Sequence, residues 1–231
     1  MPELPEVQTV INSIRPDVID RDIISCELLW GKVIYNIPQH EFHKNIINKR
    51  IIEINRHGKY IIFILSHGFM LCHLRMTGTL YIGTNRKFKK HIQAIFSLKN
   101  KSTKYLFFKD IRKFGGFYYY DKINLFRKKI GIDPFNSIFT KKWLLENLKL
   151  RRRQIKHLLL DQSILSGLGN IYIDEALWAS QIHPKQISNR ISKQKTYLLY
   201  ENIVDILKHS LEFHGTSIKD FTYNNLRTGE F

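Results

Sequence analysis

Short runs of β-branched and aromatic residues fill the chain from about residue 22 to about residue 120, and turn-forming clusters such as SHG and KNKST separate them. Runs of this length between turn residues are typical of antiparallel strands. We therefore expect the first half of the chain to form an antiparallel sandwich or barrel. The runs are IISCELLW (23–30), KVIYNI (32–37), RIIEIN (50–55), KYIIFIL (59–65), FMLCHLRM (69–76), TLYIG (79–83), IQAIFSL (92–98), KYLFFKD (104–110) and GGFYYYD (115–121).

A short amphipathic helix is predicted ahead of these strands. Val7, Val10 and Ile14 recur at helical spacing, and Pro16 is expected to end the helix. Glu6 falls in the first turn, where a carboxylate suits the positive end of the helix dipole.

The pattern changes to a period of about 3.6 residues after the connector GIDPFNS. Thr140 is a plausible N-cap for the first of these helices. The later helical segments are RRRQIKHLLLDQ, NIYIDEALWASQI and a long stretch near 188–213. The fold class is therefore α+β, and the predicted organisation is a β-sandwich domain over 1–130, a linker over 131–138 and a helical domain over 139–231.

The charge balance indicates a polyanionic partner. The chain has 37 Lys and Arg against 20 Asp and Glu, which gives a formal charge of +17 and a pI near 9.8. Nucleic acid is the simplest partner for such a charge. Ile, Lys and Asn are all plentiful, so AT-rich coding is an alternative source of part of the basicity.

The composition also narrows the cellular setting. No run of about 18 apolar residues is present, so we expect no membrane span. The N-terminus has acidic residues and prolines where a signal peptide needs basic and apolar ones. Cys26 and Cys72 each lie inside an apolar stretch, which favours two buried reduced thiols over a disulfide. These features together predict a cytoplasmic protein.

The opening MPELPEV carries the first candidate chemistry. Removal of Met1 would leave Pro2 as the first residue, with a secondary amine at its nitrogen. An α-amino group has a pKa of about 7.7–8.0, so part of it is unprotonated at neutral pH and can attack an electrophilic carbon. Glu3 could act beside it as general acid and base. From chemistry alone, an exposed first-turn carboxylate is the favoured interpretation of Glu3.

Six motifs give this sequence a resemblance to the formamidopyrimidine-DNA glycosylases, bacterial enzymes that excise oxidised purines. They occur in the family's order over almost the whole chain, which makes coincidence very improbable. The motifs are MPELPEV (1–7), GKYI (58–61), HLRMTG (73–78), DIRKFG (110–115), GLGNIYIDEALW (167–178) and HGTSIKDF (214–221).

The resemblance implies a β-sandwich domain preceded by the N-terminal helix, followed by a helical domain with a helix-two-turn-helix motif. Damaged double-stranded DNA would lie in the cleft between them, and the protein would act as a monomer. The implied activity is excision of 8-oxoguanine and formamidopyrimidines by Schiff-base chemistry, followed by strand cleavage at the abasic site.

The resemblance also implies roles for individual residues. Pro2 would be the nucleophile that attacks C1′ of the damaged nucleotide, and Glu3 its proton donor and acceptor. Lys59 would contact backbone phosphates and assist β-elimination. Glu6 would hold the active-site helix and its proton network.

Three further residues would manage the gap that base flipping leaves in the DNA stack. Met76 matches the family's apolar wedge. Arg112 and Phe114 match the pair that contacts and props the orphaned base, and an arginine fork suits a base edge. The implied DNA contacts are His73, Lys89, His91, Arg112, Arg152 and Asn170, with the assignment around 89–91 departing from the usual histidine pattern.

HGTSIKDF resembles the loop that closes over the everted base. Gly215 would be a hinge, and Thr216 and Ser217 would supply hydrogen-bonding groups. Such loops exclude water and complete a site.

One departure from the family pattern affects the cofactor. The family continues for about forty more residues with a four-cysteine zinc finger, whereas this chain stops at RTGEF and has only Cys26 and Cys72. We therefore expect no zinc ion and no other cofactor. Loss of the finger's DNA contacts would weaken binding. The alternatives are a DNA-binding remnant without catalysis and a lyase that acts only on abasic sites.

Overall fold

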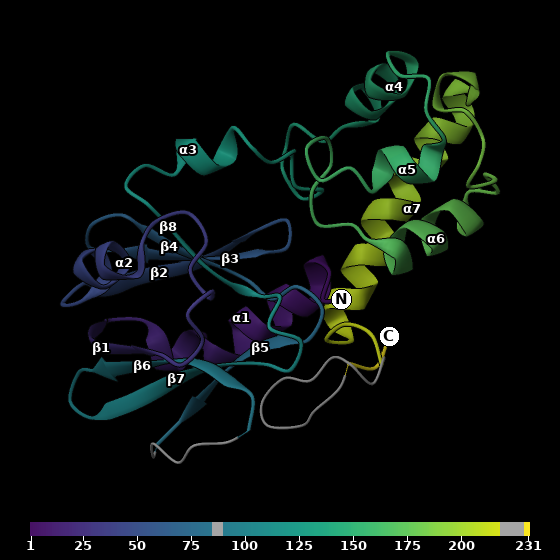
Figure 1. Ribbon diagram of the computed structural model, residues 1–231. Helices are drawn as coiled ribbons and strands as arrows, with labels where there is room; N and C mark the ends of the chain where they lie inside the picture. Colours follow the sequence, from purple (N-terminus) through teal and green to yellow (C-terminus); the bar gives the residue numbers. More distant parts are fainter. Residues whose placement is uncertain (85–89, 218–228) are drawn as a thin grey trace.

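The chain forms two lobes, one built around a β-sheet and one built of helices, in the computed structural model, which describes residues 1–84, 90–217 and 229–231 (Figure 1). The first lobe holds eight strands, and they are joined in one sheet of order β5-β7-β6-β1-β2-β3-β4-β8. The strands are β1 (Arg21–Leu28), β2 (Arg50–His57), β3 (Tyr60–Leu65), β4 (Phe69–His73), β5 (Gly78–Gly83), β6 (Ile92–Lys99), β7 (Thr103–Asp110) and β8 (Gly116–Tyr120).

The sheet folds into two layers, as the strand pattern predicts. Every pairing is antiparallel. Strands β1 and β2 pair only through Arg21↔Ile51 and Asp22↔Arg50. The sheet turns there from the β5-β7-β6-β1 layer to the β2-β3-β4-β8 layer (Figure 1). The fold is therefore the expected α+β sandwich.

The prediction of a strand at 32–37 is wrong. This segment makes only an isolated parallel bridge, Ile34↔Phe117, and helix α2 (Gln39–Ile46) follows it. The side chain of Asn36 replaces the missing ladder: its Nδ2 donates to the Tyr119 carbonyl at 2.6 Å, and its Oδ1 accepts from the Tyr119 N–H at 2.9 Å. An amide side chain can satisfy a strand's backbone in this way without strand geometry.

The N-terminal helix α1 (Leu4–Val18) runs two residues past Pro16, where the sequence predicts its end. A proline leaves the carbonyl four residues earlier without its helical donor. Here that carbonyl belongs to Asn12, and both Asn12 and Pro16 are exposed. Water can therefore reach the free carbonyl, so the last turn survives.

The second lobe is helical, as predicted. Thr140 caps α4, with its Oγ1 accepting from the Trp143 N–H at 3.1 Å. The predicted helix over 151–162 shrinks to α5, and two tight turns lead from it to α6. The first is closed by the Asp161 N–H on the Leu158 carbonyl, and the second by the Ile164 N–H on the Asp161 carbonyl. The helices of this lobe are α4 (Lys141–Lys149), α5 (Ile155–Leu159), α6 (Asn170–Ala179) and α7 (Lys193–Glu212), with a 3-10 turn at Ser188–Arg190. The short helix α3 (Asn124–Arg127) lies over the sandwich instead, where its Phe126 packs with Ile62 and Leu71 (Figure 1).

Helix α1 belongs to both hydrophobic cores. Val7, Val10 and Ile14 pack in the core of the sandwich, whereas Leu4 packs in the core of the helical lobe. The Leu4 N–H also donates to the Gly167 carbonyl at 3.0 Å. The first turn of α1 therefore lies at the junction of the two lobes, beside the C-terminal end of α7 (Figure 1).

The connector between the lobes is fastened along its length. Gly131 and Ile132 donate their N–H groups to the carbonyls of Gln162 and Ile164, and the Ser166 N–H donates to the Ile132 carbonyl. The predicted boundaries of the linker and of the two domains stay predictions. The segment itself is held against the two-turn region.

Candidate active site

Glu3 is the centre of a buried polar cluster at the lobe junction. Its side chain accepts hydrogen bonds from the backbone N–H groups of Gly169 at 2.5 Å and Ile171 at 3.1 Å. Only 3% of the residue is exposed. These donors are at the N-terminus of α6, where free N–H groups favour a negative charge. The reading of Glu3 as an exposed carboxylate is therefore wrong.

Lys59 lies in the same cluster and is also 3% exposed. It follows the tight turn between β2 and β3, which brings its ammonium to the side of the Glu3 carboxyl. Burial lowers the pKa of Lys59, and the nearby charges of Glu3 and Glu6 oppose this change. Burial likewise raises the pKa of Glu3, with Lys59 and the α6 amides offsetting part of the effect. Both shifts bring the pKa values of these groups closer to neutral pH, where a proton donor or acceptor is most effective in catalysis.

Gly169 allows this crowding. A Cβ atom on Gly169 would lie 2.3 Å from Glu3 Oε1 and 2.7 Å from Lys59 Nζ. Both distances are shorter than any van der Waals contact, so a larger residue here would force the ends of the two side chains out of their positions. The second glycine of the GLGN motif is thus required by the packing of two charged side chains.

Glu6 joins three segments from different parts of the chain. Its Oε2 accepts from the Glu3 N–H at 2.7 Å, and its Oε1 accepts from the Tyr172 hydroxyl at 2.5 Å and the Thr216 N–H at 3.0 Å. Ser210 on α7 lies 2.6 Å from the same tyrosine hydroxyl. A carboxylate with three donors is well satisfied despite its burial. Glu6 therefore fixes the first turn of α1 relative to α6 and to residue 216.

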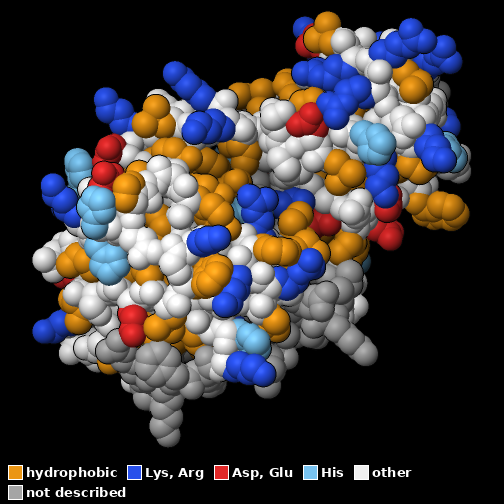
Figure 2. Space-filling model, in the orientation of Figure 1, with side chains coloured by type: hydrophobic (Ala, Val, Ile, Leu, Met, Phe, Trp, Pro, Cys, Tyr) orange, Lys and Arg blue, Asp and Glu red, His pale blue; other side chains and the backbone are white. Residues whose placement is uncertain are grey.

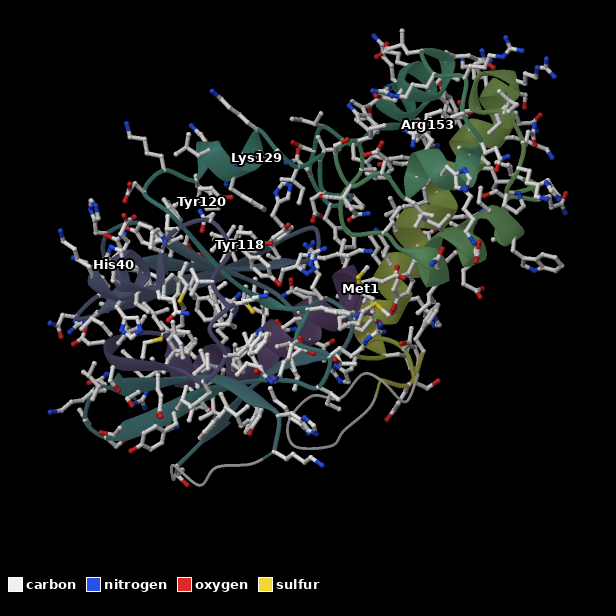
Figure 3. All side chains as sticks on the ribbon, viewed as in Figure 1. Met1, His40, Tyr118, Tyr120, Lys129 and Arg153 are labelled. Atoms are coloured by element: carbon white, nitrogen blue, oxygen red, sulfur yellow. The ribbon has the colours of Figure 1, made fainter. Side chains whose placement is uncertain are left out.

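Pro2 is buried directly before this cluster, and Met1 is 43% exposed. Met1 lies at the junction of the two lobes, close to the end of α7 (Figure 3). Removal of Met1 would leave the Pro2 nitrogen one residue from Glu3. The position suits a nucleophile that needs an adjacent acid and base.

The predicted wedge and its two partners are brought together by a buried carboxylate. Asp110 accepts from Thr77 in the turn between β4 and β5, and from the N–H groups of Arg112 (3.1 Å), Phe114 (2.8 Å) and Gly115 (2.7 Å) in the turn before β8. Met76 is partly exposed in the first turn, while Arg112 and Phe114 are exposed in the second. The Arg112 guanidinium stacks 4.8 Å from the centre of the Phe114 ring.

His73 is buried rather than presented on the surface. Burial, with Arg75 and Lys59 nearby, lowers its pKa to about 3, so the ring is neutral at physiological pH. Its Nδ1 accepts from the Arg75 N–H at 3.0 Å. The proton of the neutral ring is therefore on Nε2. His73 can donate a hydrogen bond but does not offer a positive charge, so its DNA contact stays a prediction.

The other predicted DNA contacts are divided between the lobes. His91 is half-buried, and its carbonyl accepts from the Asp110 N–H at 3.0 Å. Asn170 is exposed at the first residue of α6, and Arg152 is exposed before α5. Lys89 lies outside the described residues. Lys and Arg side chains gather where the two lobes meet and over the helical lobe (Figure 2).

Gly215 and Thr216 lie against the cluster, whereas Ser217 is exposed. Gly215 has φ +89°, and a Cβ atom there would lie 2.7 Å from Glu6 Oε1. The position therefore needs glycine for both its backbone angle and its space. The remainder of the predicted loop, from 218 onward, lies outside the described residues.

Sequence reasoning singled out neither Tyr172 nor Asp110, although each lies inside a quoted motif. Tyr172 follows the pattern of a core helix residue, and an aspartate before a turn is usually solvated. Tyr172 and Asp110 differ from an ordinary core residue and a solvated aspartate because each has a buried polar group with several hydrogen-bond partners.

The residues present do not make a four-cysteine zinc site. Cys26 and Cys72, the sequence's two cysteines, are free and buried on β1 and β4, and burial raises the pKa of both thiols. Among the described residues, no group of three or more His, Cys, Asp or Glu side chains is arranged to hold a metal ion. No helix in that part of the chain is long and apolar enough to span a membrane.

A buried carboxyl and a buried lysine beside a helix N-terminus, directly after a buried proline and with basic surface around them (Figure 2), suit an enzyme that acts on DNA. Two family models match the chain: the formamidopyrimidine-DNA glycosylase N-terminal domain over residues 1–117 and the H2TH domain of the same enzymes over residues 130–222. The chain belongs to the formamidopyrimidine-DNA glycosylase family, and it is a DNA-repair glycosylase.

Individual relatives agree with this assignment. The chain is 37% identical to the formamidopyrimidine-DNA glycosylase of Pelotomaculum thermopropionicum and 36% identical to that of Mycoplasma mobile, covering all of this chain and 85% of each relative. It is also similar to the Lactococcus lactis enzyme bound to DNA containing FAPY-dG, with a TM-score of 0.86 and 32% identity over 96% of this chain and 84% of the other. The same enzyme bound to abasic-site DNA gives a TM-score of 0.86, 32% identity, and coverage of 94% and 80%.

Proposed function

We propose that this protein excises oxidised purines, 8-oxoguanine and formamidopyrimidines, from double-stranded DNA and then cleaves the strand at the abasic site. The observation that carries the proposal is the burial of Glu3 beside Lys59, directly after Pro2. Relatives solved with FAPY-dG and with abasic-site DNA support the substrate class. The groups of this cluster come from one chain, which is consistent with a monomer.

The proposed reaction begins when the lone pair of the Pro2 nitrogen forms a bond to C1′ and the bond from C1′ to the damaged base breaks. The base leaves with the electron pair of that bond and takes up a proton, while the Pro2 nitrogen releases its own proton. Glu3 supplies a proton to the sugar ring oxygen, which opens the ring and leaves an iminium ion between Pro2 and C1′. Loss of a C2′ proton then expels the 3′ phosphate by β-elimination. Lys59, as a buried cation next to the backbone phosphates, stabilises the negative charge of that leaving group.

Borohydride trapping tests this proposal, because it reduces the iminium to a stable covalent adduct. We expect an adduct with an 8-oxoguanine duplex, and no adduct with Pro2→Gly or Glu3→Gln. Glu41→Gln, an exposed glutamate on α2, is the matched control and should trap like the parent protein. Intact mass should show that Met1 is absent from the active protein.

The same assay separates the rival functions. A lyase without glycosylase activity would trap on abasic-site DNA and leave 8-oxoguanine in place. A DNA-binding protein without catalysis would shift both duplexes in a gel and form no adduct with either.

A further inference from the structure

Arg56 and Asp133 form a buried ion pair between the two lobes, and the proposed function leaves it without a role. Arg56 is at the end of β2, and Asp133 is in the connector that leads to the helical lobe. The guanidinium makes two bonds to the carboxylate, and the two side chains are 8% and 11% exposed. A pair this deeply buried stabilises a fold only modestly, because removing both charges from water is costly.

The pair holds both backbone groups of Gly58, the residue directly before Lys59. The Gly58 N–H donates to Asp133 Oδ2 at 2.9 Å, and the Gly58 carbonyl accepts from Arg56 Nη1 at 3.2 Å. Gly58 has φ +56°. The two peptide groups that flank Gly58 are thus fixed by charged partners, and hydrogen bonds to charged groups are strong.

The second lobe fixes the same turn from its other side. A Cβ atom on Gly58 would lie 2.8 Å from the Cβ of Ser166 and 3.2 Å from the backbone nitrogen of Gly167. His57 Nε2 lies 2.8 Å from the Gly131 carbonyl. Asp133 also accepts from the Phe135 N–H at 3.0 Å, so the connector is ordered by the same carboxylate. The position of Lys59 therefore depends on the position of the helical lobe.

We infer that Arg56 and Asp133 are positioning residues that hold the ammonium of Lys59 beside Glu3 by fixing the Gly58 turn. This inference rests on the proposed function of Lys59. It gives the ion pair at the lobe junction a use that apolar packing could not supply: the carboxylate accepts from the Gly58 N–H, and the guanidinium donates to the Gly58 carbonyl. A displacement of about 1 Å in such a group can lower a rate by about 100-fold.

The kinetic test uses a preformed abasic-site duplex under single-turnover conditions, with trapped adduct giving the active fraction. Asp133→Asn should lower the strand-scission rate constant about 10- to 100-fold, with DNA affinity changed far less. Arg56→Lys keeps the charge but loses the planar fork that bonds both carboxylate oxygens, so it should be slowed as well. Asp22→Asn breaks the exposed Arg50–Asp22 pair and is the matched control, with an unchanged rate.

A double-variant cycle separates positioning from general support of the fold. If Asp133 acts through Lys59, then adding Asp133→Asn to Lys59→Ala should lower the strand-scission rate constant by less than about twofold. An equal slowing in both backgrounds would overturn the inference. A purely structural role would lower the active fraction and leave the rate constant of the active molecules unchanged, which would overturn it too.

A second measurement does not depend on activity. Lys59 should react slowly with an amine-modifying reagent in the parent protein, and its modification should rise severalfold in Asp133→Asn and Arg56→Lys while exposed Lys129 stays unchanged. Unchanged labelling of Lys59 would refute the positioning role even if the protein had no lyase activity. Loss of trapping by the parent protein would count against the proposed function alone.

Discussion

Thr77 Oγ1 lies 2.5 Å from Asp110 Oδ1, and this bond joins the turn that carries Met76 to the turn that carries Arg112 and Phe114. Asp110 is fully buried and accepts three more hydrogen bonds from the second turn. The spacing between the proposed wedge and its partners is therefore set by Asp110 together with Thr77, whose Oγ1 also accepts from the Arg112 N–H at 3.1 Å.

Asp110→Asn should loosen both turns, because an amide cannot accept from all four donors. We expect a loss of about 1.5–3 kcal/mol in the free energy of unfolding, measured in urea. Base flipping, followed with 2-aminopurine fluorescence in the DNA, should slow. Thr77→Val removes one donor to Asp110 and the Oγ1 that accepts from the Arg112 N–H, and it should give a smaller change in the same direction. Flipping at the parent rate in Asp110→Asn would show that the turns hold their spacing without this carboxylate.

Gly169→Ala should abolish activity by crowding Glu3 and Lys59. The added methyl would lie 2.3 Å from Glu3 Oε1, so the carboxyl group must move. We expect the trapping rate to fall by about 100-fold or more. Gly31→Ala is the control, because its methyl would meet only Gln39 Nε2, at 3.5 Å. Near-normal trapping by Gly169→Ala would mean that the position of Glu3 is not critical.

Glu3→Gln should change stability in a pH-dependent way. Burial, partly opposed by Lys59, raises the pKa of Glu3 above its usual 4.5, so the folded protein holds this proton more tightly than the unfolded chain does. Stability from this group is therefore lost as pH rises through the folded pKa. The free energy of unfolding of Glu3→Gln, compared with that of the parent protein, should therefore be higher at about pH 8 than at about pH 4. Thermal unfolding at both values measures the difference, and no difference would contradict the raised pKa.

His73→Gln should flatten the acid limb of the stability profile. Burial lowers the pKa of His73 from 6.5 to about 3, so the unfolded chain takes up this proton first. Stability from neutral His73 is complete above pH 6.5 and declines as pH falls toward 3. At about 1.4 kcal/mol for each pKa unit, a few kcal/mol are involved. Urea titrations of both proteins across this interval test the prediction, and parallel profiles would argue against it.

The residue pattern predicts part of the fold. Short β-branched and aromatic runs between turn residues predict most of the strands. Val7, Val10 and Ile14 predict the first helix, because their helical spacing records which face is buried. The same reasoning fails at 32–37, where Asn36 supplies side-chain hydrogen bonds in place of a strand ladder. It also fails at Pro16, where exposure lets the helix continue.

The sequence by itself determined the two-part architecture, the crowding of reactive groups at the N-terminus and, by resemblance, the residues to consider. Tertiary structure decided the chemical state of those residues. Glu3 meets Gly169 across 166 positions of the chain, and Glu6 meets Thr216 across 210. Burial and long-range partners set a carboxyl's or an ammonium's affinity for protons, and neither is written in the residues beside it.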